Sequence, residues 1–238
     1  MSLITSTVDA QTAVALDVQA STFPQASSSA PALAADGPPP IATAVTATDA
    51  NTPLIDYVKH TKPPVLVDTT AGSAGFALIG AAVAIASGHA IVVDNAIQDP
   101  SGDMAHELAT AYAAAHGDRV ADAPIPDDHL WTRAKSETLV QQSSGASYVV
   151  DVDPPGMTLI YFPLDWKHYD LTFMSGVRII DTSDGKIVAK TRCYLKSQKT
   201  PGAMTHGELL ANGAVALKQL IVSKSEACVA QMKAGLKL

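Results

Sequence analysis

The stretch HYDLTFMSGVRIID, residues His168–Asp181, decides the fold of this 238-residue chain. Its large apolar side chains recur at every second position on one face, whereas the other face carries polar side chains. This period of two is typical of a half-buried β-strand. The apolar face consists of Tyr169, Leu171, Phe173, Val177 and Ile179, and the polar face includes Asp170, Thr172 and Arg178.

A hairpin follows this strand. The tetrad 182–185 (TSDG) is a turn sequence, and the alternation resumes over Lys186–Lys196. Two further strands precede it, at Ser147–Asp153 and Met157–Phe162, separated by a Pro-Pro-Gly turn. The second half of the chain therefore predicts an antiparallel meander.

Helices are predicted on both sides of these strands. Asp99-Pro100 is typical of a helix start, and the helix should end at Gly117. Another helix is expected from Asp127 through Leu139. From about His206 to Lys233 apolar residues recur at helical spacing, which predicts a long C-terminal helix over the sheet. The fold class is α+β, with a mixed, largely antiparallel sheet and a C-terminal meander covered by helices.

The domain organisation follows from a shift in composition. Residues 1–62 are rich in Ala, Thr, Ser and Pro, and we interpret them as a disordered or extended N-terminal arm. Pro63-Pro64 introduces the run Val65–Val67, which predicts the first buried strand. Residues 63–238 should therefore form a single α+β domain.

The segment Thr69–Val93 contains 25 residues without Asp, Glu, Lys or Arg and is dominated by Ala and Gly. That length would span a bilayer, and small residues allow close approach of helices. The segment is poor in Leu and Phe and contains His89, which favours a buried or surface-packed helix, with a break expected at Ser87-Gly88. Both interpretations stay open, and with them membrane association.

The charge of the chain argues against one class of partner. The formal net charge is −7 and only 16% of residues are charged. Such a chain has no broad cationic surface to neutralise phosphates, so we expect no nucleic-acid partner.

The two cysteines allow one intramolecular disulfide. Cys193 lies on the inward face of the last strand of the meander, and Cys228 lies on the apolar stripe of the C-terminal helix. The two patterns bring both thiols to one interface. A disulfide would indicate an oxidising compartment such as a periplasm, and the alternative is a pair of buried reduced thiols.

The chain shows no recognisable catalytic motif: G-x-S-x-G, H-E-x-x-H and the Walker loop are all absent. The glycines between Gly72 and Gly88 do not fit a dinucleotide fingerprint, so we expect no cofactor. His168 and Asp170 lie two apart on one strand and could serve an acid/base pair or a metal, but two groups do not make a site. We therefore predict neither catalytic residues nor a metal site, and an enzyme acting near these two residues remains an alternative.

Aromatic residues gather where the chain breaks between two strands, around Pro163. Phe162, Trp166 and Tyr169 are candidates for binding a protein partner, because aromatic side chains commonly anchor such surfaces. The alternative is that they plug the end of the sheet.

The chain resembles a group of uncharacterised bacterial envelope lipoproteins over residues 63–238. The resemblance rests on Ile97–Pro100, Tyr161–Trp166, Asp181–Ile187, Glu208–Gly213 and the two cysteines. It implies a secreted α+β domain with a disulfide in or near the outer membrane, and no catalytic residues. The element order is also similar to that of the TolB amino-terminal domain, curli secretion lipoproteins and penicillin-binding-protein activator lipoproteins, which act through protein contacts.

These observations together predict a non-enzymatic periplasmic or outer-membrane-associated protein that binds a protein partner or acts as a scaffold. The lipoprotein pattern lacks its N-terminal Cys here, and no Lys or Arg precedes Lys59, so no ordinary signal segment is visible in the chain. A membrane-inserting or oligomer-forming component that uses residues 69–93 is the second expectation.

Overall fold

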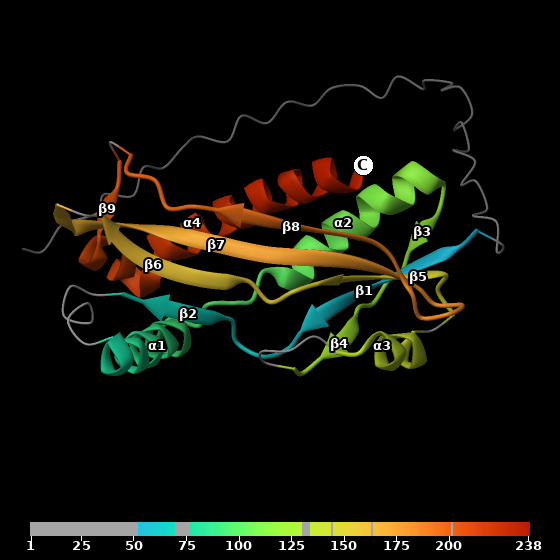
Figure 1. The fold of residues 1–238 in the computed structure, drawn as a ribbon, viewed down its shortest axis with the longest axis horizontal. Coiled ribbons are helices and arrows are strands. Elements are labelled where there is room, and N and C mark those ends of the chain that lie inside the picture. The colour runs from blue at the N-terminus through green and yellow to red at the C-terminus, as the bar shows by residue number, and fades with distance from the viewer. Residues whose placement is uncertain (1–51, 70–76, 130–133, 144, 163, 201) are drawn as a thin grey trace, which may run out of the picture. The chain divides into compact units, whose positions relative to one another are not determined.

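The structure is a computed structural model that describes residues 52–69, 77–129, 134–143, 145–162, 164–200 and 202–238 (Figure 1). The described chain forms one sheet and four helices. The strands are β1 (Leu54–His60), β2 (Val65–Asp68), β3 (Arg119–Val120), β4 (Ile125–Asp127), β5 (Tyr148–Val152), β6 (Gly156–Phe162), β7 (Asp165–Asp181), β8 (Ile187–Leu195) and β9 (Met204–Thr205). The helices are α1 (Ala77–Asp94), α2 (Ser101–His116), α3 (Ser136–Gln142) and α4 (His206–Leu236).

The long strand β7 organises the sheet, whose main path is β2-β6-β7-β5-β1-β3. Its first half pairs antiparallel with β6 and its second half with β5, while β8 and β9 pair with β7 and β4 pairs with β1. The pairs of β1 with β3, β4 and β5, and of β2 with β6, are parallel. The α+β class, the mixed and largely antiparallel sheet, the meander and the long C-terminal helix are as predicted.

The domain begins earlier than predicted. Leu54–His60, placed in the arm by the sequence, is the strand β1, which lies between β5 and β3 in the sheet. Ile55 and Val58 are fully buried, and so are the polar side chains of Asp56 and His60. The prediction that residues 1–62 form an arm is wrong over β1, because buried polar residues concealed its strand pattern. Residues 1–51 lie outside the described residues.

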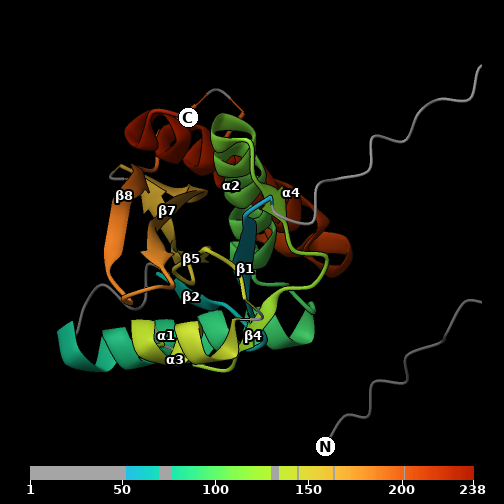
Figure 2. The ribbon, with the colours of Figure 1, turned by 90° about the vertical axis from the view of Figure 1, so that its right-hand side faces the viewer.

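Helices cover both faces of the sheet (Figure 2). Helices α2 and α4 cover the face that holds the main core, and α1 and α3 lie on the opposite face. The main core includes Leu108, Leu159, Leu171, Phe173 and Leu217, and a smaller core under α3 includes Val58, Leu139, Val149 and Ile180. The alternation of β7 therefore points its apolar side chains at α4, as predicted.

Helix α1 is continuous through Ser87 and Gly88, so the predicted break is absent from this described helix. Gly88 instead allows close packing, because a Cβ at this position would overlap the main-chain carbonyl of Leu66 on β2. Among the described residues, no helix is long and apolar enough to cross a membrane.

Two other predicted helices differ from the structure. Asp127 ends the strand β4 rather than starting a helix, and the helix that holds Leu139 begins only at Ser136. Residues 130–133 lie outside the described residues. Helix α4 starts where predicted, with a capping box between Thr205 and Glu208, but residues 211–214 leave the helical conformation. The buried stripe of α4 starts at Leu209.

Candidate functional site

A row of four residues crosses the sheet on the face opposite α4. Val65 on β2 pairs with Gly156 on β6, Gly156 pairs with Met174 on β7, and Met174 pairs with Tyr194 on β8. Because paired residues of neighbouring strands point to the same face, these positions form one line. A parallel line, Val67, Thr158 and Thr172, lies beside it.

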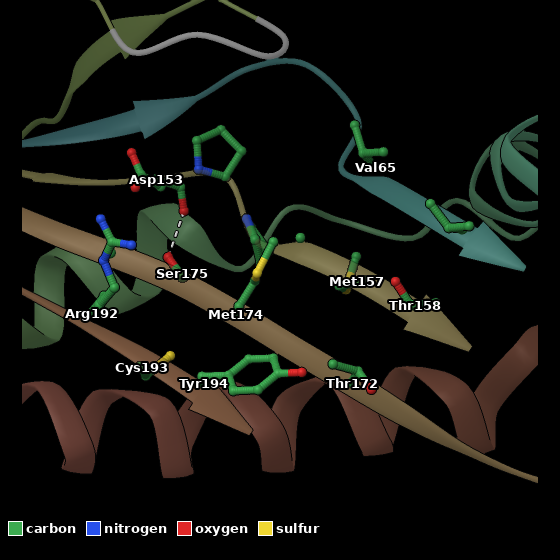
Figure 3. Close-up of a pocket in the computed structure, with 15 residues that line it drawn as sticks. Val65, Asp153, Met157, Thr158, Thr172, Met174, Ser175, Arg192, Cys193 and Tyr194 are labelled. Carbon is green, nitrogen blue, oxygen red and sulfur yellow. Dashed lines mark hydrogen bonds between the residues drawn. The ribbon is translucent and has the colours of Figure 1, made fainter. Parts of the chain in front are cut away.

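These two lines form the floor of a groove of about 710 Å³ (Figure 3). Asp153, Pro154 and Pro155 line its end near the β5–β6 turn, where the Ser175 hydroxyl donates a hydrogen bond of 2.7 Å to the Asp153 main-chain carbonyl. The volume lies in the range typical of ligand and peptide sites. Figure 3 shows Met174 in the middle of the groove, between Val65 and Tyr194.

Gly156 shapes the floor of the groove. A Cβ at this position would lie 3.0 Å from Met174 Cε and 3.2 Å from Met174 Cγ, so the methionine side chain rests on the glycine. The thioether is flexible and polarisable, which suits a surface that adapts to its ligand. Glycine at position 156 therefore provides the space in which Met174 lies.

The groove exposes large apolar surface. Met174 is 54% exposed and Tyr194 is 52% exposed, although α1 packs on β2 beside them and α3 covers the far end of this face. Large apolar side chains that are contiguous and exposed commonly mark interaction sites.

The strand β8 adds positive charge along one edge of the groove. Arg192 lines the groove, and Lys190 and Lys196 lie two before and four after it in the chain; all three side chains are exposed. The Lys196 ammonium lies 5.9 Å from the centre of the Tyr194 ring, within the range of a cation–π contact. The groove therefore has a basic side at β8, whereas Asp153 lines its end near the β5–β6 turn.

The predicted disulfide lies under the same strand. Cys193 and Cys228 are bonded, with a Cα–Cα distance of 5.4 Å, and both are buried. The bond ties β8 to α4, and it confirms the prediction that strand and helix place both sulfurs at one interface. It holds the strand that carries Arg192 and Tyr194 in place from the opposite face.

The structure separates the three aromatic residues proposed to bind a partner. Phe162 and Tyr169 are buried, with exposures of 8% and 6%, whereas Trp166 is 54% exposed. Tyr161 packs against Trp166 and Tyr169, with ring centres 4.7 and 6.1 Å apart. Within this cluster only Trp166 offers a large surface to a partner.

His168 and Asp170 have different neighbours. The His168 imidazole lies 2.7 Å from the Asp165 carboxylate, which also pairs with Lys199. The hydrogen bonds from Lys199 and His168 lower the pKa of Asp165 to about 2. Asp170 accepts hydrogen bonds from the Gln198 amide and from Lys224. The contact of His168 stays within β7, whereas those of Asp170 join Gln198 and α4 to β7.

The sequence pattern did not single out the groove, although one signal was present. Met174 is an apolar residue on the face of β7 that otherwise carries Asp170, Thr172 and Arg178. An apolar residue on a polar face marks a place where the face is either covered or used. The sequence does not identify the neighbouring positions on β2 and β6, because they depend on the register of β2 with β6 and of β6 with β7.

No protein-family model matches the chain, and no curated protein does. Three solved structures match the chain at low similarity. A dodecameric variant of PelC from Paraburkholderia phytofirmans is 13% identical, with a TM-score of 0.29, over 78% of this chain and 88% of that chain. A lipoprotein from Neisseria meningitidis is 15% identical, with a TM-score of 0.24, over 75% of this chain and 99% of that one. A homolog of a neuraminyllactose-binding hemagglutinin from Helicobacter pylori is 9% identical, with a TM-score of 0.26, over 74% and 85%. At these values the likenesses carry no functional argument.

Proposed function

We propose that this chain is a non-enzymatic, protein-binding or scaffold component of the bacterial cell envelope, and that its groove binds an extended segment of a partner protein. The row Val65, Gly156, Met174 and Tyr194 is the observation on which the proposal rests. It offers an adaptable apolar floor that is open to the surface.

The chemistry of the partner follows from the charges beside that floor. Arg192 lines the groove, and Lys190 and Lys196 are exposed near it along the chain, so a segment that combines carboxylates with apolar side chains would complement both parts of the groove. Charge complementarity mainly sets specificity and association rate, while burial of Met174 and Tyr194 would supply affinity.

The disulfide supports a location in the cell envelope. Bonds of this kind persist in secreted and periplasmic proteins and are rare in the reducing cytoplasm. The bond between Cys193 and Cys228 is buried, which protects it from reduction. The location in the cell envelope is therefore part of the proposal, and the resemblance to envelope lipoproteins supports it.

A photo-crosslinking amino acid at position 194 tests the groove directly. In cells of the native host, replacement of Tyr194 should give one discrete adduct after illumination, and mass spectrometry of that adduct should identify a segment with Asp or Glu near apolar residues. The same amino acid at Val222, which is 53% exposed on α4, is the matched control and should not give this adduct.

Charge reversal provides a second arm. Arg192→Glu should lower the yield of the adduct. It should leave the fold unchanged, because the side chain is exposed. An adduct of equal yield from both positions, or a crosslinked segment that is basic, would refute the groove as the binding site.

A further inference from the structure

Two buried titratable residues face each other at the ends of β1 and β4. His60 and Asp127 are direct partners in the parallel pairing of these strands, and each residue is 5% exposed. His60 Nδ1 lies 3.2 Å from Asp127 Oδ2. Neither atom has a hydrogen-bond partner among the described residues.

The hydrogen bond on the other side of the His60 ring defines its tautomer. His60 Nε2 lies 2.9 Å from the main-chain carbonyl of Val152, and a carbonyl only accepts. Nε2 therefore carries the proton, and in the neutral ring Nδ1 presents a lone pair. That lone pair faces the Asp127 carboxylate, so two buried acceptors stand opposite each other. Such a pair is costly unless a cation lies between them.

The nearby carboxylates differ in how they are paired. Asp151 Oδ1 lies 3.8 Å from His60 Nε2, but Asp151 is paired with Arg178, whose Nε donates to it at 2.7 Å. The Arg178 guanidinium also donates to the Ala134 carbonyl. Arg178 neutralises Asp151, and Asp127 Oδ1 contacts His129. Asp127 Oδ2, which faces His60 Nδ1, is the carboxylate oxygen here without a hydrogen-bond partner among the described residues.

Two more ligand groups follow Asp127 in the chain. One carboxylate oxygen of Asp127, one of Asp128 and His129 Nδ1 all lie within 4.8 Å of one another. His129 Nδ1 contacts Asp127 Oδ1 directly and lies 3.9 Å from Asp128 Oδ1. Asp128 and His129 are exposed, so the cluster opens to solvent on one side and to His60 on the other.

We propose that Asp127, Asp128, His129 and His60 form a binding site for a divalent transition-metal ion, with Zn²⁺ as the preferred ion. His60 faces Asp127 Oδ2 and His129 faces Oδ1, so the exposed side chains of Asp128 and His129 would turn towards Oδ2 when the ion binds. Two imidazole nitrogens and two carboxylates are a ligand set that suits Zn²⁺, which takes four ligands in structural sites. Mg²⁺ and Ca²⁺ favour all-oxygen ligands and would bind less well. The ion would balance the carboxylate charge and accept the lone pair of His60 Nδ1.

The sequence pattern did not predict this site, because His60 lies 67 positions before Asp127 and was assigned to the arm. Parallel pairing of β1 with β4 brings the two together. Binding would join the end of β1 to the end of β4 and to the residues after it. The ion would therefore stabilise this part of the fold.

Titration of the full chain tests the proposal. The protein is first stripped with a chelator, and ZnCl₂ is then added in a calorimeter. We expect one Zn²⁺ per chain and a higher unfolding midpoint with the ion, with much weaker binding of MgCl₂. Asp128→Asn and His129→Gln change exposed side chains only, and each should weaken Zn²⁺ binding about 10-fold or more.

Controls separate this site from ordinary surface histidines. His89→Gln, on the exposed surface of α1, should leave Zn²⁺ affinity unchanged. Nitrogen NMR of the His60 ring reports whether Nδ1 binds the ion, without a buried substitution that could unfold the chain.

Two results would overturn the proposal. Equal Zn²⁺ affinity of the parent chain and His129→Gln would show that any binding lies elsewhere. An imidazole of His60 that stays protonated at both nitrogens when Zn²⁺ is added would show that a proton balances Asp127 and that no ion enters.

Discussion

His206 Nε2 lies 3.1 Å from each of the two carboxylate oxygens of Asp68, although 138 positions separate the residues in the chain. Asp68 ends the buried strand β2, and His206 opens the C-terminal helix α4. The Ser87 hydroxyl of α1 donates to the same carboxylate at 2.7 Å. One buried carboxylate therefore joins three elements from both halves of the chain.

This contact predicts a pH dependence of stability. Burial acts to raise the pKa of Asp68, but the hydrogen bonds from His206 and Ser87 outweigh it and the pKa lies below its ordinary value of 3.8. The hydrogen bond to Asp68 raises the pKa of His206 above 6.5. The stabilisation from Asp68 is therefore lost as pH falls through its lowered pKa, and that from His206 is lost as pH rises through its raised pKa.

The measurement is urea unfolding of the parent chain and His206→Gln across pH. Between pH 3.8 and 6.5 we expect the variant to be less stable by about 1.5 to 3 kcal/mol, the range for hydrogen bonds to charged groups. The difference should shrink above the raised pKa of His206. His89→Gln is the control, and a constant difference across the whole range would contradict the ion pair.

The disulfide should contribute a large share of the stability. The two cysteines are separated by 35 positions, and closing a loop of that length in the unfolded chain stabilises the fold by roughly 3 to 4 kcal/mol. The variant with both Cys193 and Cys228 replaced by Ser should lose about that free energy of unfolding. Addition of a reductant should destabilise the parent and leave this variant unchanged. The reductant is added while the chain is unfolded, so that it reaches the disulfide. A parent chain with the same stability before and after this treatment would contradict the prediction.

Gly88→Ala should destabilise the domain by about 1 to 3 kcal/mol, because the added methyl overlaps the Leu66 carbonyl and separates α1 from β2. Gly207→Ala is the matched control, since it lies in a helix with nothing within 4 Å of the new Cβ. That substitution should be neutral or slightly stabilising, because Ala favours a helix. Thermal unfolding of both variants measures the difference, and equal midpoints would argue against close packing at Gly88.

The buried pair of Asp151 and Arg178 should be sensitive to loss of one partner. Arg178→Met leaves the Asp151 carboxylate buried without its cation, which should cost about 3 to 5 kcal/mol of unfolding free energy. The double variant that also carries Asp151→Asn should recover much of this loss. Chemical denaturation of the two single variants and the double variant gives the coupling energy. A double variant as unstable as the sum of the singles would show that the pair is not coupled.

The elements that could be predicted are those whose pattern is local. The alternation of β7 and the apolar stripe of α4 each follow from the residues of one element, and together they placed Cys193 against Cys228 before any pairing was known. Asp99 also lies at a helix start, where its carboxylate accepts the Ser101 amide at 2.8 Å.

The predictions fail where a local pattern is broken by a residue whose partner lies far away in the chain. β1 was missed because Asp56 and His60 are buried, and their partners, Ser143 and Val152, come from much later in the chain. The groove and the proposed metal site share this cause. Both depend on which strands become neighbours, and the sequence pattern does not define the register between β1 and β4 or between β2 and β6.

The position of β1 has a mechanical consequence. The chain enters the described domain through a strand that is bonded to β5 on one side and to β3 and β4 on the other. A pulling force applied through the preceding residues would act along this strand and load both sets of parallel hydrogen bonds at once, as shear. An edge strand would peel away one bond at a time under the same force. We therefore expect the domain to resist tension applied from its N-terminal side.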